Sequence, residues 1–284
     1  MRALTRRGFL ALSAGGVVAA CGGSGGSGGD GGSAPAAGSV VAVRYFPDGI
    51  HVAGRPERLP FGLAGPDGIP LTDGPASLAF TVTDAAGKVV AEGEAARHGD
   101  GIPRPYYPVE LNLPTAGIYN LAGRTALGPV EAALSLVAPG AVRLPGTGDR
   151  MPAFDTPTVS DARGVDPLCT REQPCPFHGR TLTEALATGR PVAYLVGTPA
   201  HCQTGICGPV LDLLVAEAER FGGIVVHAEV FSDPAGRKVA PAVSALGLDF
   251  EPVLFVIGAD GAVRHRLDVI YDATELRTAL AGAA

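Results

Sequence analysis

The sequence predicts two folded parts: an all-β sandwich over residues 40–143 and an α/β domain over residues 146–284. The first part has short apolar runs of strand length, separated by Gly and Pro, with no cysteine and no helical period. The second part alternates strand-like runs with helical patterns, which is typical of an α/β sheet. The chain has 284 residues, 46% of them hydrophobic, so it can bury two cores of ordinary size.

The N-terminus has the pattern of an export signal. A basic stretch precedes the apolar run Phe9 to Ala20, which has signal-peptide length and is too short to span a bilayer. Residues 5–10 (TRRGFL) resemble a twin-arginine signal, and residues 18–21 (VAAC) resemble a bacterial lipobox. The resemblance implies cleavage before Cys21 and lipid attachment to it, on the extracytoplasmic face of the cell membrane. An ordinary secretory signal with an accidental cysteine is the alternative.

Composition adds a tether and excludes one class of partner. Residues 22–39 are nearly all Gly, Ser and Ala, so they cannot pack a core, and we expect them to join the membrane to the folded parts flexibly. The formal net charge is -6, and no basic run follows the N-terminus, so nucleic acid is not an expected partner.

Strand-like runs follow one another through the predicted sandwich. They are Val40–Val43, Ser77–Val82, Tyr107–Leu111 and Val130–Leu136. Residues 114–121 (PTAGIYNL) resemble the corner before a late strand of immunoglobulin-like domains, which implies that the Tyr119 hydroxyl bonds back to the chain. No site-like cluster of residues stands out, so this part is either a spacer or a binding module.

The α/β part predicts its elements in order. Thr181 and Glu184 form a capping box at the start of a helix, because each can bond the other's backbone N–H. The expected strands are 191–196, 224–231, 253–257 and 263–269, the last two forming a hairpin, and the expected helices are 181–188, 210–221, 238–246 and 273–283.

Four cysteines remain once Cys21 is lipidated. An even number in an exported protein suggests disulfides, and the simplest pairing joins Cys169 to Cys175 and Cys202 to Cys207. A zinc site built from all four cysteines is the alternative, although neither pair has the two-residue spacing of zinc knuckles. His178, His227 and His265 are dispersed in the sequence, and we expect each to be a surface or strand histidine. The sequence therefore predicts no metal and no cofactor.

The pair Cys202 and Cys207 is the candidate redox site. It lies between a buried strand and a helix start, where backbone N–H groups and the helix dipole stabilise a thiolate. The order of strand, cysteine pair, helices, Pro252 and hairpin resembles the thioredoxin superfamily, and Gly148–Asp155 resembles the start of its membrane-anchored members. The resemblance covers nearly all of residues 146–284.

The resemblance implies a function. It implies a thioredoxin-like fold and a thiol–disulfide oxidoreductase that acts on protein disulfides or dithiols. Cys202 would attack, Cys207 would resolve the mixed disulfide, and Pro252 would be cis and pair with the substrate chain. The adjacent imidazole of His201 would lower the thiol pKa of Cys202 when protonated, or it is simply a solvated histidine.

The pair departs from the family pattern in its spacing. Four residues separate the two cysteines, where the family has two. The run Cys207-Gly208-Pro209 also copies the start of the thioredoxin box, so a second alignment makes Cys207 the attacking residue. The strand-to-cysteine spacing favours Cys202.

Pro174 and Pro176 stiffen the loop from Cys169 to Cys175, which favours a structural bridge over a relay partner for the other pair.

The rival to an oxidoreductase is a non-catalytic binding scaffold with a permanent 202–207 disulfide. A copper carrier resembling Sco-type chaperones is less favoured, because the cysteine spacing differs and no histidine stands before Pro252 at a fitting position.

Overall fold

The structure is a computed structural model that describes residues 40–283. The predicted signal, the lipidation of Cys21 and the tether over residues 22–39 lie outside the described residues. Between residues 40 and 283, no helix is both long enough and apolar enough to cross a membrane.

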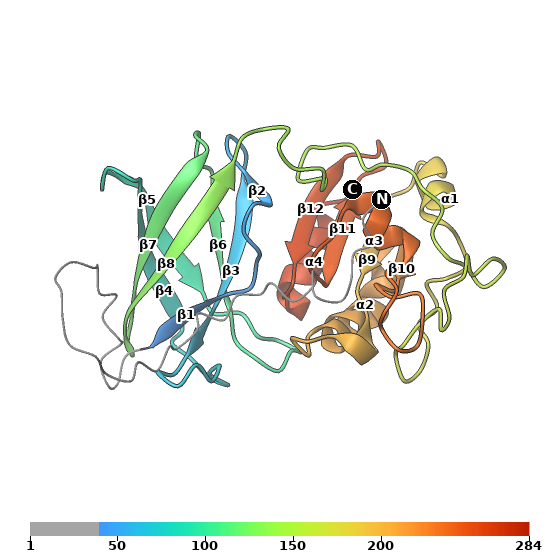
Figure 1. Cartoon of the computed structure of the whole chain (residues 1–284), viewed down its shortest axis with the longest axis horizontal. Coiled ribbons are helices and arrows are strands. Elements are labelled where there is room, and N and C mark those ends of the chain that lie inside the picture. The colour runs from blue at the N-terminus through green and yellow to red at the C-terminus, as the bar shows by residue number, and fades with distance from the viewer. Residues whose placement is uncertain (1–39, 284) are drawn as a thin grey trace, which may run out of the picture.

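The N-terminal part of the described chain is a β-sandwich (Figure 1). One sheet has three strands in the order β1-β3-β6, and the other has five in the order β2-β8-β7-β4-β5. The strands are β1 (Val41–Arg44), β2 (His51–Val52), β3 (Glu57–Ala64), β4 (Ser77–Thr83), β5 (Val89–Ala96), β6 (Tyr107–Leu111), β7 (Gly117–Thr125) and β8 (Gly128–Val137).

Alternation of side chains gives this sandwich its core. Along β4, Leu78, Phe80 and Val82 point inward and are buried, because successive residues of a strand face opposite sides of the sheet. At the corner before β7, the buried Tyr119 donates a hydrogen bond from its hydroxyl to the carbonyl of Thr115 at 2.7 Å. The corner expected from the sequence is therefore present.

The C-terminal part is a four-stranded sheet in the order β10-β9-β11-β12. Strands β9 and β10 are parallel, whereas β11 is antiparallel to both β9 and β12. The strands are β9 (Val192–Val196), β10 (Ile224–Ala228), β11 (Val253–Ile257) and β12 (Val263–Asp268), and the helices are α1 (Leu182–Ala187), α2 (Cys207–Phe221), α3 (Pro241–Leu246) and α4 (Ala273–Ala281). All residues of β9 and β11 are buried.

The predicted α/β thioredoxin-like fold class is wrong. The described chain is mostly β, with three sheets and four short helices, and its class is β-sandwich-like. The helices expected over 181–188 and 238–246 are each six residues long, and residues 138–181 form no helix and no named strand. Pro241 limits α3, because a proline disfavours the helical conformation at the residue before it, and Ala240 is extended. The capping box of Thr181 and Glu184 is present, and the expected strands exist individually.

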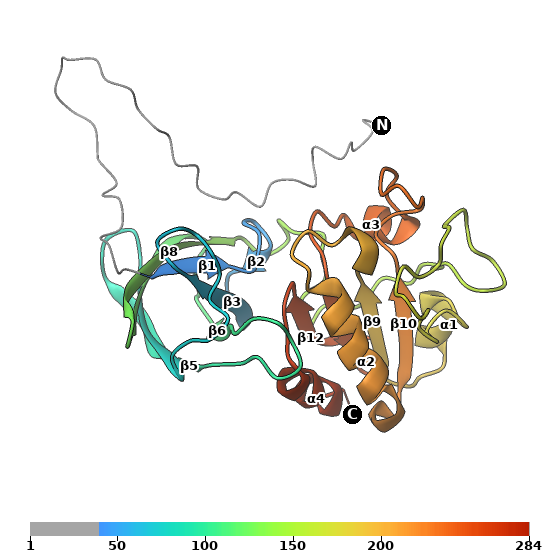
Figure 2. The ribbon, with the colours of Figure 1, turned by 90° about the horizontal axis from the view of Figure 1, so that it is seen from below.

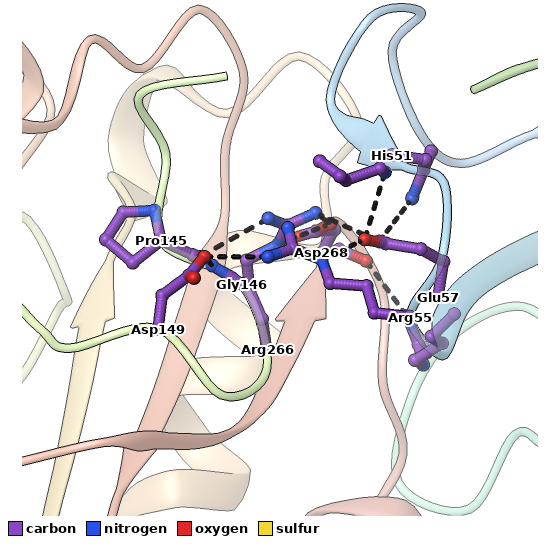
Figure 3. Close-up of polar contacts among 10 residues, drawn as sticks. His51, Arg55, Glu57, Pro145, Gly146, Asp149, Arg266 and Asp268 are labelled. Carbon is purple, nitrogen blue, oxygen red and sulfur yellow. Dashed lines mark hydrogen bonds and ion pairs between the residues drawn. The ribbon is translucent and has the colours of Figure 1, made fainter. Parts of the chain in front are cut away.

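A buried polar network joins the sandwich to the C-terminal sheet (Figure 3). The carboxylate of Glu57 on β3 meets His51 Nδ1 at 3.0 Å, accepts a hydrogen bond from Arg55 at 2.7 Å and lies 3.8 Å from Arg266 on β12. Arg266 also pairs with Asp268 at 3.0 Å. Burial would raise the pKa of Glu57, but hydrogen bonds from His51 and Arg55, with the Arg266 charge, lower it to about 2. The carboxylate is thus held in its charged form.

A second set of contacts ties the two parts together at α4. Arg58 of the sandwich pairs with Glu275, which also accepts a hydrogen bond from the Tyr106 hydroxyl. The loop between β5 and β6 reaches across to the C-terminal part (Figure 2), where His98 Nδ1 lies 3.1 Å from Asp272. The apolar core of the C-terminal part includes Tyr45, Ile50 and Tyr106 from the sandwich region. The sandwich therefore packs directly against the C-terminal part and is not joined to it by the connecting chain alone.

Candidate functional site

A disulfide joins Cys202 to Cys207 at the start of α2, as the sequence predicts. A short 3-10 turn, Pro199–His201, follows β9 and leads into the bridge. Gly205 turns the longer loop with a φ of 69°, a conformation that glycine adopts without strain, and the buried Ile206 anchors the loop before the helix. The helix begins at Cys207, three residues before the expected start, so this cysteine lies in its first turn.

The two sulfur atoms have different surroundings. Cys202 is partly exposed, whereas Cys207 is only 1% exposed. The backbone N–H of Cys207, a free donor at the helix start, donates to Cys202 Sγ at 3.1 Å, and the Thr204 hydroxyl lies 3.2 Å from the same sulfur. Cys202 is therefore the sulfur that a partner can reach, and the helix start favours its thiolate.

Glu251 is a partly buried residue whose carboxyl group lies beside the inner sulfur. Its Oε2 atom lies 3.5 Å from Cys207 Sγ and accepts a hydrogen bond from the Thr198 backbone N–H at 2.6 Å. Burial raises the pKa of Glu251 to about 8, and the nearby charge of Glu229 adds to this shift. A group with that pKa can hold or release a proton near neutral pH. Glu251 was not among the site residues predicted from the sequence, although it directly precedes Pro252.

Pro252 stands where the sequence analysis expects it. The Glu251–Pro252 peptide bond is cis. A Cβ atom built on Gly197 would lie 3.1 Å from Pro252 Cβ and 3.8 Å from Cys207 Cβ, so the backbone of Gly197 lies close to both the proline and the bridge. The site thus brings together two separate segments of the chain, one with Cys202 and Cys207 and the other with Glu251 and Pro252.

His201 does not take the position expected for a thiolate partner. Its imidazole packs edge-on against Phe231, with the ring centroids 5.5 Å apart. The polar contacts to Cys202 Sγ in the described chain come instead from Thr204 and the N–H of Cys207. Although His201 directly precedes Cys202 in the sequence, its imidazole makes no polar contact with Cys202 Sγ among the described residues.

The predicted Cys169–Cys175 bridge is absent from the described chain, in which both cysteines are free and buried. Cys175 Sγ lies 3.3 Å from His178 Nε2 and 3.4 Å from His227 Nδ1, so each sulfur has imidazole neighbours as well as the other sulfur. His178 and His227 were expected as scattered surface or strand histidines. They are 4% and 0% exposed, because the loop carrying His178 packs on β10, which carries His227.

Comparisons with known proteins identify no relative. No family model matches the chain, and no curated protein matches it. A superoxide reductase (neelaredoxin) from Ignicoccus hospitalis is 14% identical over 34% of this chain and 79% of its own, with a TM-score of 0.25. The bacterial hydrophobin BslA is 14% identical over 35% of this chain and 99% of its own, with a TM-score of 0.21. Similarities this low carry no argument about fold or function.

Proposed function

We propose that the protein is a thiol–disulfide oxidoreductase that acts on protein disulfides or dithiols through Cys202 and Cys207. The observation that carries the proposal is the asymmetry of the bridge. The outer sulfur, of Cys202, is partly exposed and accepts a hydrogen bond from the backbone N–H of Cys207 at the helix start. The inner sulfur, of Cys207, is buried beside the carboxyl group of Glu251. A permanent structural bridge needs neither feature.

The proposed reaction runs by thiol–disulfide exchange. In the reduced protein the Cys202 thiolate attacks a partner disulfide, which forms a mixed disulfide and releases one partner thiolate. Glu251, ionised, takes the proton of the Cys207 thiol. The Cys207 thiolate then attacks Cys202 Sγ, which restores the internal bridge and releases the second partner thiolate. Two electrons pass to the partner, whose two thiolates take up one proton from Glu251 and one from solvent, which holds the proton that Cys202 lost on ionising. The reverse sequence oxidises a partner dithiol.

The surroundings of the two sulfurs favour one order of attack. In the second alignment, Cys207 attacks first, but this sulfur is 1% exposed and faces Glu251. An incoming disulfide would have to reach it through the folded chain. We therefore assign the attack to Cys202 and the resolving step to Cys207.

The site of action is part of the same proposal. The lipobox resemblance at residues 18–21 and the adjacent Gly/Ser-rich stretch support export and a lipid anchor on Cys21, with the redox part on the extracytoplasmic side of the cell membrane. That compartment supports disulfide chemistry, so its protein partners would carry disulfides or dithiols.

Trapping of a partner tests the assignment of roles. The Cys207→Ser variant lacks the resolving thiol, so after reduction and removal of the reductant it is expected to accumulate a mixed disulfide through Cys202 when a disulfide-bonded substrate protein is added. Mass spectrometry of the non-reduced peptides identifies the bond. The Cys202→Ser variant is the matched control, and it should trap little. Trapping through Cys207 in that control would make Cys207 the attacking residue and Cys202 the resolving one. Trapping in neither variant would contradict the proposed oxidoreductase activity.

A further inference from the structure

Four ligand-type side chains converge at a place that the redox proposal does not use. Cys169, Cys175, His178 and His227 are all buried, and their ligand atoms all lie within 4.8 Å of one another. We infer that these four residues form a closed, four-coordinate zinc site. The inference rests on this cluster alone and stands independently of the redox function of Cys202 and Cys207.

The distances fit a tetrahedral ion. With ligand bonds of about 2.0–2.3 Å, a tetrahedral Zn²⁺ places its ligand atoms about 3.3–3.8 Å apart. Cys175 Sγ lies 3.3 Å from His178 Nε2 and 3.4 Å from His227 Nδ1, and the two imidazole nitrogens are 3.4 Å apart. The sulfur of Cys169 lies within 4.8 Å of the other three ligand atoms. The spacing thus leaves room for one ion between four donors.

The outer contacts prepare the donors for a metal. His227 donates its Nε2 proton to the carbonyl of Gly197 at 2.9 Å, which leaves the lone pair of Nδ1 facing the cluster. The backbone N–H of Cys175 donates to Cys169 Sγ at 3.4 Å, and that of Phe177 bonds to Cys175 Sγ. N–H donors of this kind stabilise thiolates.

Charge balance favours zinc in this buried position. Zn²⁺ displaces the two thiol protons, and the two thiolates then cancel its charge while both imidazoles stay neutral. A neutral centre avoids the cost of burying an unpaired charge. Two sulfur and two nitrogen donors in a tetrahedron are a common structural zinc set, and no position is left open for a substrate.

The zinc site would fix the segment that leads into Cys202. Thr170, the neighbour of Cys169, has its hydroxyl 3.3 Å from that of Thr198 and accepts the Ala200 N–H at 3.1 Å. The backbone N–H of Thr170 donates a hydrogen bond to the carboxylate of Glu229 at 2.6 Å. Loss of the metal would therefore loosen residues 197–200 as well as the loop of residues 169–178.

Metal content of the purified, folded chain is the test. After dialysis against Zn²⁺ and then buffer, we expect one bound zinc per chain, and a cobalt-substituted sample should show the visible bands of tetrahedral Co²⁺ with thiolate charge transfer. The Cys175→Ser variant should lose most of the zinc. The double variant Cys202→Ser with Cys207→Ser removes the other pair and should retain it.

A second measurement on the wild-type protein does not depend on a variant that folds. Chelation of the metal should raise the hydrogen-exchange rates of the Thr198 and Ala200 amides. Three results would overturn the inference: a Cys169–Cys175 disulfide in non-reduced peptides with no retained metal, zinc that persists unchanged in the folded Cys175→Ser variant, or a site that binds Cu⁺ and rejects Zn²⁺.

Discussion

The surroundings of Glu251 bear directly on proton transfer at the Cys202–Cys207 bridge. Its carboxyl group lies 3.5 Å from Cys207 Sγ, and burial raises its pKa to about 8. Below that pH the group is protonated and can give a proton to the Cys207 thiolate that leaves when a partner dithiol opens the bridge. Above that pH it is ionised and can take the proton back.

Replacing Glu251 with Gln is expected to slow reduction of the bridge and change its pH dependence. In the wild type, the rate per reacting dithiolate should fall as pH rises through about 8, because the proton on Glu251 is lost. The variant should lack this fall, and at pH 7 it should react roughly 10²-fold more slowly, at the low end of general acid–base effects. Stopped-flow kinetics with a small dithiol measure both.

An exposed glutamate on the same helix as Cys207 serves as the matched control. Glu219→Gln changes the same functional group at a solvent-facing position of α2, so its pH profile should follow that of the wild type. If Glu251→Gln keeps the fall near pH 8 and the full rate, Glu251 does not exchange protons with Cys207.

At the scale of elements, two buried tyrosines differ in whether their hydroxyl groups have partners. Tyr119 on β7 donates to the Thr115 carbonyl at 2.7 Å. Tyr194 on β9 is fully buried, and its hydroxyl has no hydrogen-bond partner in the described chain. A buried hydroxyl without a partner costs free energy, whereas a paired one stabilises the fold.

Phenylalanine substitutions at these two positions should have different effects on the free energy of unfolding. Tyr119→Phe removes a satisfied bond at the corner before β7 and should lower the free energy of unfolding by about 1 kcal/mol. Tyr194→Phe removes a hydroxyl without a partner and should leave that free energy unchanged or raise it by about 1 kcal/mol. Urea unfolding of both variants beside the wild type gives the values. Equal destabilisation of both would contradict the description of β9.

The sequence predicts elements better than it predicts the site. The strands, the capping box of Thr181 and the bridge of Cys202 and Cys207 follow from local patterns, because alternation, capping and cysteine spacing act over a few residues. The fold class could not be read in this way. It depends on how short the helices become and how many strands assemble, and Pro241 limits α3 at a point that periodicity alone does not mark.

The missed site residues are joined only by the tertiary structure. His227 lies 49 positions from His178 in the sequence, and their nitrogens are 3.4 Å apart because β10 packs beside the loop that carries His178. Glu251 reaches Cys207 across 44 positions. No local spacing could reveal either pairing, although a glutamate directly before a singled-out proline was a signal available in the sequence.

At the scale of the whole molecule, the sandwich and the C-terminal sheet share buried polar contacts. Glu57 and Arg266 come from different parts of the chain, and their side chains are 6% and 4% exposed. Arg58 and Glu275 form a second link. A passive spacer would not need such contacts, so we expect the sandwich to stabilise the C-terminal part and to fix its orientation.

Acid should weaken this interface through Glu57. Its pKa is about 2 in the folded protein, against 4.5 as the ordinary value, so the carboxylate stabilises the fold fully above pH 4.5. That stabilisation is lost as pH falls from 4.5 towards 2, at up to about 1.4 kcal/mol per pH unit. Urea unfolding of wild type and Glu57→Gln across this range should show their difference shrinking towards acid.

A solvent-exposed glutamate of the sandwich provides the comparison for this effect. Glu92→Gln on β5 should track the wild type over the same pH range. A constant difference between Glu57→Gln and the wild type from pH 7 down to pH 2 would mean that the network does not hold Glu57 in its charged form.

The reduction potential of the Cys202–Cys207 bridge in the folded protein tests the central claim most directly. Equilibration with a glutathione or dithiothreitol buffer, followed by alkylation and mass spectrometry, gives its value. Because Cys202 is reachable and its thiolate is stabilised at the start of α2, we predict a potential less negative than about -300 mV and ready reduction by millimolar dithiothreitol. A bridge that stays oxidised under these native conditions, with a potential below about -300 mV, would contradict the oxidoreductase and leave a structural disulfide in a binding scaffold.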